Sequence, residues 1–305
     1  LAGGLTDDKR LDEPTQARTL ACLHRFGERL RGLSPEAIRC VGTSALRVAK
    51  NADEFIPKAE IALGHPIEIV AGREEARLIY LGVAHSLPAS PDRRLVVDIG
   101  GGSTEFIIGQ GLKPHERESL HMGCVNFSRR FFPDGAIDKG ALKAAEVAAR
   151  VEVERIAREF SIGNWQQAVG SSGTARALRE ILEQNGWTAR GITADGLDRL
   201  RAQLLKGGHV DALDFAGLTR DRRPVVAGGF AIMAGLFAEL GIEQMDVAET
   251  AMREGILYDL LGRFHKQDMR EATVGEFARR YHIDTQQAAR VKRVPPSSCV
   301  CMLAL

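Results

Sequence analysis

The chain carries LVVDIGGGSTEFIIG at residues 95–109, and this stretch decides the fold class. The apolar run from Arg94 to Ile99 predicts a strand that enters three consecutive glycines. Residues 105–108 suit a second short strand, which ends at Gly109. The glycines therefore predict a hairpin between two strands, whereas a dinucleotide-binding motif would need them to open a helix.

This glycine loop has the composition of a phosphate cradle. Without Cβ atoms in the way, backbone N–H groups can turn toward an anion. We therefore expect the loop to bind phosphate through Gly100, Gly101, Gly102, Ser103 and Thr104. A plain tight turn is the alternative interpretation.

Two acidic residues, Asp98 and Glu105, bracket the loop. Mg²⁺ keeps several waters and is usually held by one or two carboxylates together with substrate phosphate. The pair is thus a candidate Mg²⁺ site, and structural capping is the alternative.

A second glycine turn follows a predicted strand at residues 167–169 and precedes a predicted helix at 174–185. The free N–H groups and the helix dipole would point to one place there, which favours another phosphate. The candidate residues are Gly170, Ser171, Ser172, Gly173 and Thr174. A serine nucleophile is disfavoured, because the spacing is not GxSxG and no histidine is suitably placed.

The third candidate group contains glutamates and an arginine. Glu74 and Glu75 fall in the first turn of a predicted helix, where negative charge is favourable in any case. Adjacent helical positions point in different directions, so at most one of them can face a cleft as a general base. Arg47 follows a predicted strand, and its planar donors match phosphate oxygens.

Strands and helices alternate along much of the chain, which predicts an α/β architecture. From the length of 305 residues alone, about two domains are expected. We place the first domain at 1–79, the second at 80–262, and the beginning of a helical third domain at 263–305. Further helices are predicted at 14–33 and 139–160.

Composition excludes several classes of protein. The 41 Lys and Arg nearly cancel the 40 Asp and Glu, so any polyanion must be met by a local patch, and nucleic acid is not an expected partner. The longest uncharged stretch, Pro224 to Ala238, is shorter than a membrane span, which predicts a buried helix and no integral membrane segment. Five cysteines without a CxxC pair suit a reducing cytoplasm.

Five segments together resemble the exopolyphosphatase and guanosine pentaphosphate phosphohydrolase family. They are Val41–Arg47, Glu68–Leu78, Val96–Glu105, Val169–Thr174 and Met252–Gly255. The combination of EEARL at 74–78 with DIGGGSTE at 98–105 is the most specific part. The similarity extends to about Val294 and is closer to the exopolyphosphatase branch.

The resemblance implies a two-lobed fold of the actin, sugar-kinase and Hsp70 superfamily. It also implies a cytoplasmic, Mg²⁺-dependent homodimer with a link to the stringent response, in which water attacks the terminal phosphorus of inorganic polyphosphate. Glu75 matches the family's base, and Asp98 and Glu105 match its metal-proximal acids. Arg47 would assist them.

This sequence also departs from the family pattern. Members begin with a further phosphate loop, Asp-x-Gly-Ser-Asn-Ser, and this chain is expected to start after it, with an incomplete first lobe. Residues 295–305 do not match the family. Three alternatives therefore stand beside exopolyphosphatase activity: guanosine pentaphosphate (pppGpp) hydrolysis, an inactive or polyphosphate-binding fragment, and a kinase of the same superfamily.

Overall fold

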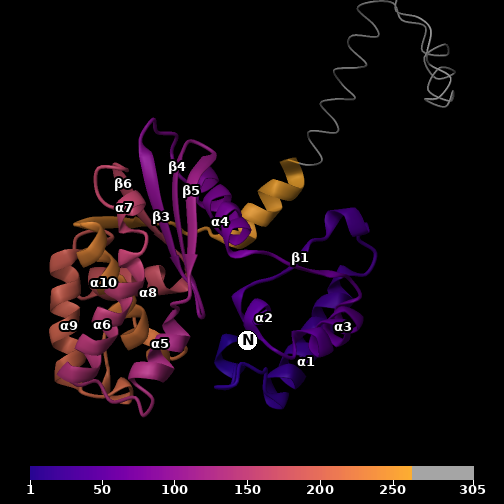
Figure 1. Ribbon diagram of the computed structural model, residues 1–305, viewed down its shortest axis with the longest axis horizontal. Helices are drawn as coiled ribbons and strands as arrows, with labels where there is room; N and C mark the ends of the chain where they lie inside the picture. The colour runs from indigo at the N-terminus through magenta and orange to yellow at the C-terminus, as the bar shows by residue number, and fades with distance from the viewer. Residues whose placement is uncertain (263–305) are drawn as a thin grey trace, which may run out of the picture. The chain divides into compact units, whose positions relative to one another are not determined.

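The computed structural model of the chain describes residues 1–262 (Figure 1), of which Leu1–Tyr258 form one compact unit. The predicted third domain, 263–305, lies outside the described residues. The architecture is α/β, as predicted.

A six-stranded mixed sheet is the centre of the larger lobe, with strand order β5-β4-β3-β6-β8-β7. Its strands are β3 (Arg93–Ile99), β4 (Thr104–Gln110), β5 (Lys113–Leu120), β6 (Gln167–Ser171), β7 (Ile192–Thr193) and β8 (Gln244–Val247). The first three are antiparallel, and β6 runs parallel to β3. The hairpin predicted at the glycines is confirmed, and Asp98 lies opposite Glu105 in it.

Helices cover both faces of this sheet (Figure 1). They are α4 (Gly72–Ser86), α5 (Cys124–Phe131), α6 (Lys139–Glu154), α7 (Ala157–Phe160), α8 (Ser172–Gln184), α9 (Ala194–Gly207) and α10 (Val226–Leu240), and residues 252–262 are also helical. Helix α4 packs on one face, whereas α6 and α10 belong to the core of the other. The helix predicted at 139–160 is interrupted at 155–156, between α6 and α7.

The alternation of side chains along the hairpin decides what α4 contacts. Val97 and Phe106 point into the core shared with α10, while Val96 and Ile107 pack with α4. Because successive strand residues alternate between faces, Asp98 and Glu105 lie on the α4 side of the sheet. The N-terminal turn of α4 can therefore bring a third carboxylate to the same place.

Helix α10 is the predicted buried helix. Its window Arg223–Leu240 is long and apolar enough to cross a membrane by composition, but 72% of that window is buried in the protein. The helix packs against α5 and α6. It is therefore better explained as a core helix.

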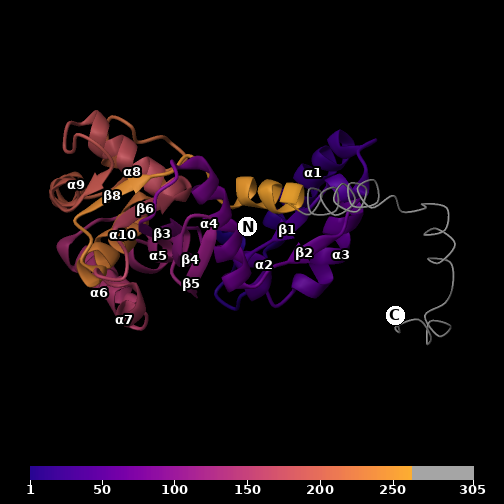
Figure 2. The ribbon, with the colours of Figure 1, turned by 90° about the horizontal axis from the view of Figure 1, so that it is seen from above.

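The smaller lobe has a parallel two-stranded sheet of β1 (Cys40–Gly42) and β2 (Ile67–Ile69). Its helices are α1 (Glu13–Leu30), α2 (Ser44–Val48) and α3 (Ala52–Leu63). Short 3-10 turns lie at Ala2–Gly4 and Pro35–Ala37, and two more, Val210–Ala212 and Arg223–Val225, belong to the larger lobe. Helices α1 and α3 pack together around Phe55 and Ala59 (Figure 2).

The predicted domain boundary between residues 79 and 80 requires correction. It falls inside α4, a continuous helix whose buried residues Ile79, Tyr80 and Val83 all pack on the large sheet. A boundary before Gly72 fits the packing better, because it leaves α4 whole.

Candidate active site

The glycine loop is held in place by the N-terminal end of α5. The N–H groups of Cys124 and Val125 donate to the carbonyls of Gly100 and Gly101, at 2.9 and 3.1 Å. A bond of 2.9 Å from Gly100 N–H to the Ser103 carbonyl closes the turn. In the described part of the chain, the N–H groups of residues 101–103 donate to no protein acceptor. These three donors therefore have no acceptor in the described part of the chain.

The glycines are needed for close approach rather than for an unusual backbone conformation. None of Gly100, Gly101 and Gly102 has a positive φ. A Cβ on Gly102 would lie 3.1 Å from Ser44 Oγ, and a Cβ on Gly101 would lie 3.3 Å from Ala2 Cβ. The loop thus fits closely against residues of the smaller lobe.

Glu75 is the glutamate that faces the loop. Arg47 Nη1 donates to Glu75 Oε2 at 2.6 Å and to the Val70 carbonyl at 2.8 Å, so both side chains have a fixed orientation. Glu74 instead pairs with Arg77 on the same helix, at 2.8 Å. Burial raises the pKa of Glu75, and the Arg47 guanidinium opposes this rise. Of the two adjacent glutamates, Glu75 is therefore the one that lines the cleft.

Two further carboxyl groups lie behind the loop. Asp98 is 7% exposed and Glu105 is 1% exposed, and Ser119 Oγ donates to Glu105 Oε1 at 2.8 Å. Burial raises the pKa of Asp98 to about 6, and the negative charge of Glu75 adds to this rise. Burial and the charges of Glu75 and Asp98 raise the pKa of Glu105 to about 8. Glu75, Asp98 and Glu105 therefore repel one another when they are ionised.

This carboxylate set fits a hard divalent cation. Within residues 1–262, no three His, Cys, Asp or Glu side chains converge closely enough to hold an ion by themselves. Mg²⁺ does not require such a cage, because it binds through one or two carboxylates, waters and substrate phosphate. A cation would also offset the repulsion that raises the pKa values of Asp98 and Glu105.

A cleft of about 420 Å³ is lined by some of the candidates, whereas Arg47, Asp98 and Glu105 do not line it. Glu75, the glycine loop at 100–103 and the turn at 42–45 all line it. Thr43 and Ser44 add hydroxyl groups opposite the loop. The second glycine turn does not line this cleft.

The second turn is nevertheless bonded directly to the strand that precedes the glycine loop. Ser172 Oγ and Thr174 Oγ1 both donate to the Ile99 carbonyl, at 2.9 and 3.0 Å. The predicted strand and helix are confirmed, but they meet directly, since β6 ends at Ser171 and α8 begins at Ser172, so the residues of the predicted turn are divided between the two elements. The turn therefore positions the end of β3.

Two of the predicted phosphate-binding residues have side chains that point away from the cleft. Thr104 and Ser171 are fully buried strand residues, and their hydroxyls donate to the carbonyls of Met122 and Thr250 at 2.6 and 3.1 Å. Neither lines the cleft. Ser171 also lies opposite Asp98 in the β3–β6 ladder, and a hydrogen bond from its hydroxyl opposes the rise in the pKa of that carboxyl.

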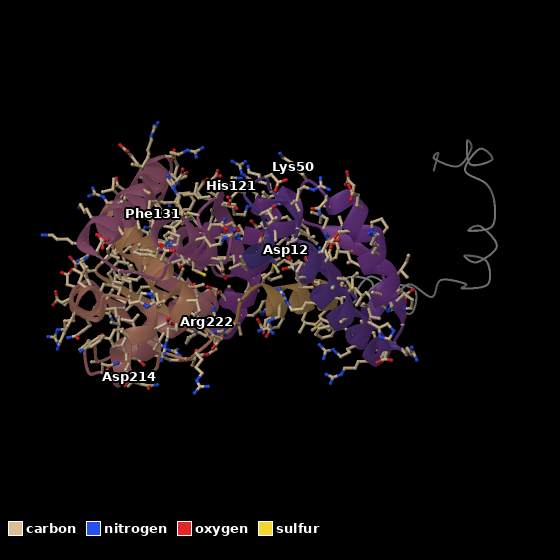
Figure 3. All side chains as sticks on the ribbon, turned by 90° about the horizontal axis from the view of Figure 1, so that it is seen from below. Asp12, Lys50, His121, Phe131, Asp214 and Arg222 are labelled. Carbon is tan, nitrogen blue, oxygen red and sulfur yellow. The ribbon has the colours of Figure 1, made fainter. Side chains whose placement is uncertain are left out.

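Sequence reasoning missed two polar residues of the site. The Arg222 guanidinium lies against Gly173, where a Cβ would collide with it, and so brings positive charge to the second turn (Arg222 is labelled in Figure 3). Ser119 lies opposite Glu105 in the β4–β5 ladder. Residues 115–119 are all polar, so the sequence has no hydrophobic alternation that could have indicated β5.

Comparison with known proteins agrees with this geometry. A family model described as the Ppx/GppA phosphatase family matches residues 1–264. The chain belongs to this family. The resemblance seen in the sequence motifs is confirmed, and the family is one of phosphatases.

Solved structures support the same assignment. The Aquifex aeolicus Ppx/GppA family member is 25% identical, with a TM-score of 0.68, over 86% of this chain and 87% of that one. An exopolyphosphatase from Cytophaga hutchinsonii is 24% identical, with a TM-score of 0.71, over 85% and 86%. An exopolyphosphatase-like protein is 22% identical, with a TM-score of 0.75, over 87% and 89%. The actin-like α/β fold is thereby confirmed for this Ppx/GppA chain.

Ser172 gives a test of how the second turn is held. It is a non-glycine residue with φ +76°, a conformation that costs about 1–2 kcal/mol outside glycine. Ser172→Ala keeps this strain and loses the bond to Ile99, so we expect the free energy of unfolding to fall by about 1–2 kcal/mol. Ser172→Gly loses the bond but relieves the strain. Urea unfolding should give a larger free energy of unfolding for Ser172→Gly than for Ser172→Ala. The reverse order would contradict this account.

Proposed function

We propose that this Ppx/GppA chain hydrolyses the terminal phosphate of inorganic polyphosphate and releases orthophosphate. One observation carries the proposal. Glu75, oriented by Arg47, shares a cleft with three backbone N–H groups that have no protein acceptor. This pairing of a base with anion donors suits attack of water on a phosphoryl group.

The chemistry follows from these positions. The loop N–H groups bind the oxygens of the terminal phosphate and stabilise charge that develops on them. Glu75 takes a proton from water as the water oxygen bonds to the terminal phosphorus. The bridging P–O bond breaks, and the shortened chain leaves with the bridging oxygen. Phosphoryl transfer depends mostly on such positioning and charge stabilisation.

Asp98 and Glu105 would hold Mg²⁺ on the α4 side of the sheet. When bound, the ion would supply charge neutralisation for the phosphate oxygens. Arg47 keeps Glu75 oriented and, through its positive charge, favours the carboxylate form that accepts the proton.

Substrate hydrolysis tests the proposal directly. The purified chain is assayed with Mg²⁺ for orthophosphate release from inorganic polyphosphate and, separately, from guanosine pentaphosphate. We expect turnover of polyphosphate with the higher kcat/KM. A preference for guanosine pentaphosphate would support the other branch of the family. Binding of polyphosphate without any turnover would contradict the proposed hydrolysis and support a binding module.

A further inference from the structure

A hollow of about 510 Å³ lies on the larger lobe, between the loop that follows α4 and the ends of β3, β6 and β8. We call it the arginine hollow, because Arg94, Arg179 and Arg190 line it. Small-molecule sites in proteins usually enclose about 300–1,000 Å³. Among the described residues, none lines both this hollow and the active-site cleft.

The arginine hollow and the candidate metal site lie at different ends of the same two strands. Arg94 lies opposite Gln167 in the β3–β6 ladder, and four residues further along Asp98 lies opposite Ser171. Because these positions differ by an even number, Arg94 and Asp98 lie on the same face of the sheet. Four strand residues span about 13 Å. The hollow is therefore a separate site.

Arg94 is the side chain that indicates a ligand. It is only 5% exposed, yet among residues 1–262 no carboxylate pairs with it. Its Nε donates to Gln167 Oε1 at 2.9 Å, and its Nη2 donates to the Pro88 carbonyl at 2.6 Å. A buried charge without a counter-ion is costly, so buried cations are usually paired. Arg94 therefore lacks an anion.

The unused end of this guanidinium is open to the hollow. A guanidinium has five N–H donors, and within the described residues Nη1 has no acceptor. The fully enclosed side-chain atoms without a partner, in the part of the chain that the structure describes, are Ser128 Oγ and Arg223 Nε. Arg94 Nη1 is not one of them. It can therefore be reached from the hollow that Arg94 lines.

The orientation of Arg94 is fixed before any ligand binds. Gln167 Nε2 donates to Asp92 Oδ2 at 3.2 Å, which turns the Gln167 carbonyl oxygen toward Arg94. Asp92 thus acts on Arg94 only through this amide. A preorganised donor binds an anion with a smaller loss of conformational entropy.

The two other arginines of the hollow already have acidic partners. Arg190 Nε pairs with Asp246 Oδ1 at 3.1 Å. Arg179 Nη1 pairs with Glu249 Oε1 at 2.6 Å. Among the described cations that line the hollow, Arg94 is therefore the one whose charge is not offset by a direct ion pair.

The rest of the lining indicates which kind of anion fits. Glu183 and Asp246 also line the hollow, and their repulsion disfavours a doubly charged phosphate relative to a singly charged carboxylate. Leu87, Val169 and Val247 add apolar surface, which suits a hydrocarbon body. A planar carboxylate also matches the donors of a guanidinium. The lining therefore favours a small organic acid with one carboxylate.

We propose that the arginine hollow binds a small monocarboxylic acid, whose carboxylate pairs with Arg94 and whose hydrocarbon part lies against the apolar wall. This site goes beyond the proposed function and does not depend on it. Arg94 is a binding residue that takes no part in phosphate hydrolysis.

The probes for the test are butyrate, acetate and inorganic phosphate, each added to the purified chain. Saturation-transfer difference NMR measures each Kd, and amide hydrogen exchange with mass spectrometry locates the bound anion. We expect butyrate to bind more tightly than acetate, because it buries more apolar surface. Butyrate should slow exchange at residues 87–94 and leave residues 100–103 unchanged.

Two variants test the role of Arg94. Arg94→Gln should raise the Kd for butyrate about tenfold or more, because a charge-assisted hydrogen bond is lost. Ala89→Glu does not alter the buried arginine. Ala89 is exposed and lines the hollow, so the new carboxylate can occupy the place of the ligand. This variant should also raise the Kd about tenfold and should be more stable to urea. The matched control, Ala21→Glu on the exposed side of α1, should leave the Kd unchanged.

Several results would overturn the proposal. One is a folded wild-type chain that binds no butyrate, or that is protected by butyrate only at residues 100–103. Another is an Ala89→Glu protein with the wild-type Kd for butyrate. Stronger protection of residues 87–94 by inorganic phosphate than by butyrate would contradict the assignment to a carboxylate.

Discussion

Glu75→Gln lowers kcat for orthophosphate release by about 10²- to 10⁴-fold, because the amide cannot accept the proton of the attacking water. The substitution keeps the size of the side chain and an oxygen that can still accept the bond from Arg47. Substrate binding should therefore change much less than kcat. Steady-state phosphate release and equilibrium binding of polyphosphate provide the two measurements.

The neighbouring glutamate supplies the matched control for this prediction. Glu74 lies on the same helical turn but pairs with Arg77 and does not line the cleft. Glu74→Gln should leave kcat within about threefold of the wild-type value. Equal effects of the two substitutions would show that Glu75 has no special role as a base.

The second large effect is expected for Glu105→Gln. This substitution should stabilise the metal-free protein and should abolish Mg²⁺-dependent activity. The pKa of Glu105 is raised to about 8, so the folded state holds a proton that the unfolded state releases near its ordinary pKa of 4.5. Stability is therefore present at low pH and is lost as the pH rises through about 8. Glu105→Gln removes this loss, which is on the order of a few kcal/mol at pH 9.

Urea unfolding in EDTA at pH 5 and pH 9 measures this effect. The wild-type chain should lose stability between the two pH values, whereas Glu105→Gln should lose much less. Glu116→Gln, on the exposed part of β5, is the control and should behave as the wild type. Parallel assays with Mg²⁺ should show loss of activity only for Glu105→Gln. A Glu105→Gln protein that is less stable at pH 9 and fully active would contradict both parts.

The local pattern of apolar residues and glycines was sufficient to predict several strands and helices of this protein. The apolar runs on either side of Gly100–Gly102 predicted the β3–β4 hairpin, and the turn before α8 followed from the same logic. Alternation of side chains in strands is a local property, so Asp98 and Glu105 could be recognised as a bracketing pair. The family resemblance then favoured Glu75 over Glu74 as the expected base.

Other parts depend on contacts that are distant in sequence. Ser119 and Arg222 reach the site only through strand pairing and through a loop that folds back on Gly173. Strand β5 was missed because most of its side chains are polar, which removes the hydrophobic alternation. The boundary at 79/80 was misplaced for a related reason, because the packing of α4 on the large sheet cannot be read from its own residues.

Hydrolysis of polyphosphate in ¹⁸O-labelled water tests the central claim most directly. If Glu75 directs water to the terminal phosphorus, each released orthophosphate carries one labelled oxygen, and the shortened chain carries none. Label in the shortened chain would mean that water attacks the penultimate phosphorus instead of the terminal one. Release of unlabelled orthophosphate, or no release by a folded chain with Mg²⁺, would contradict the account.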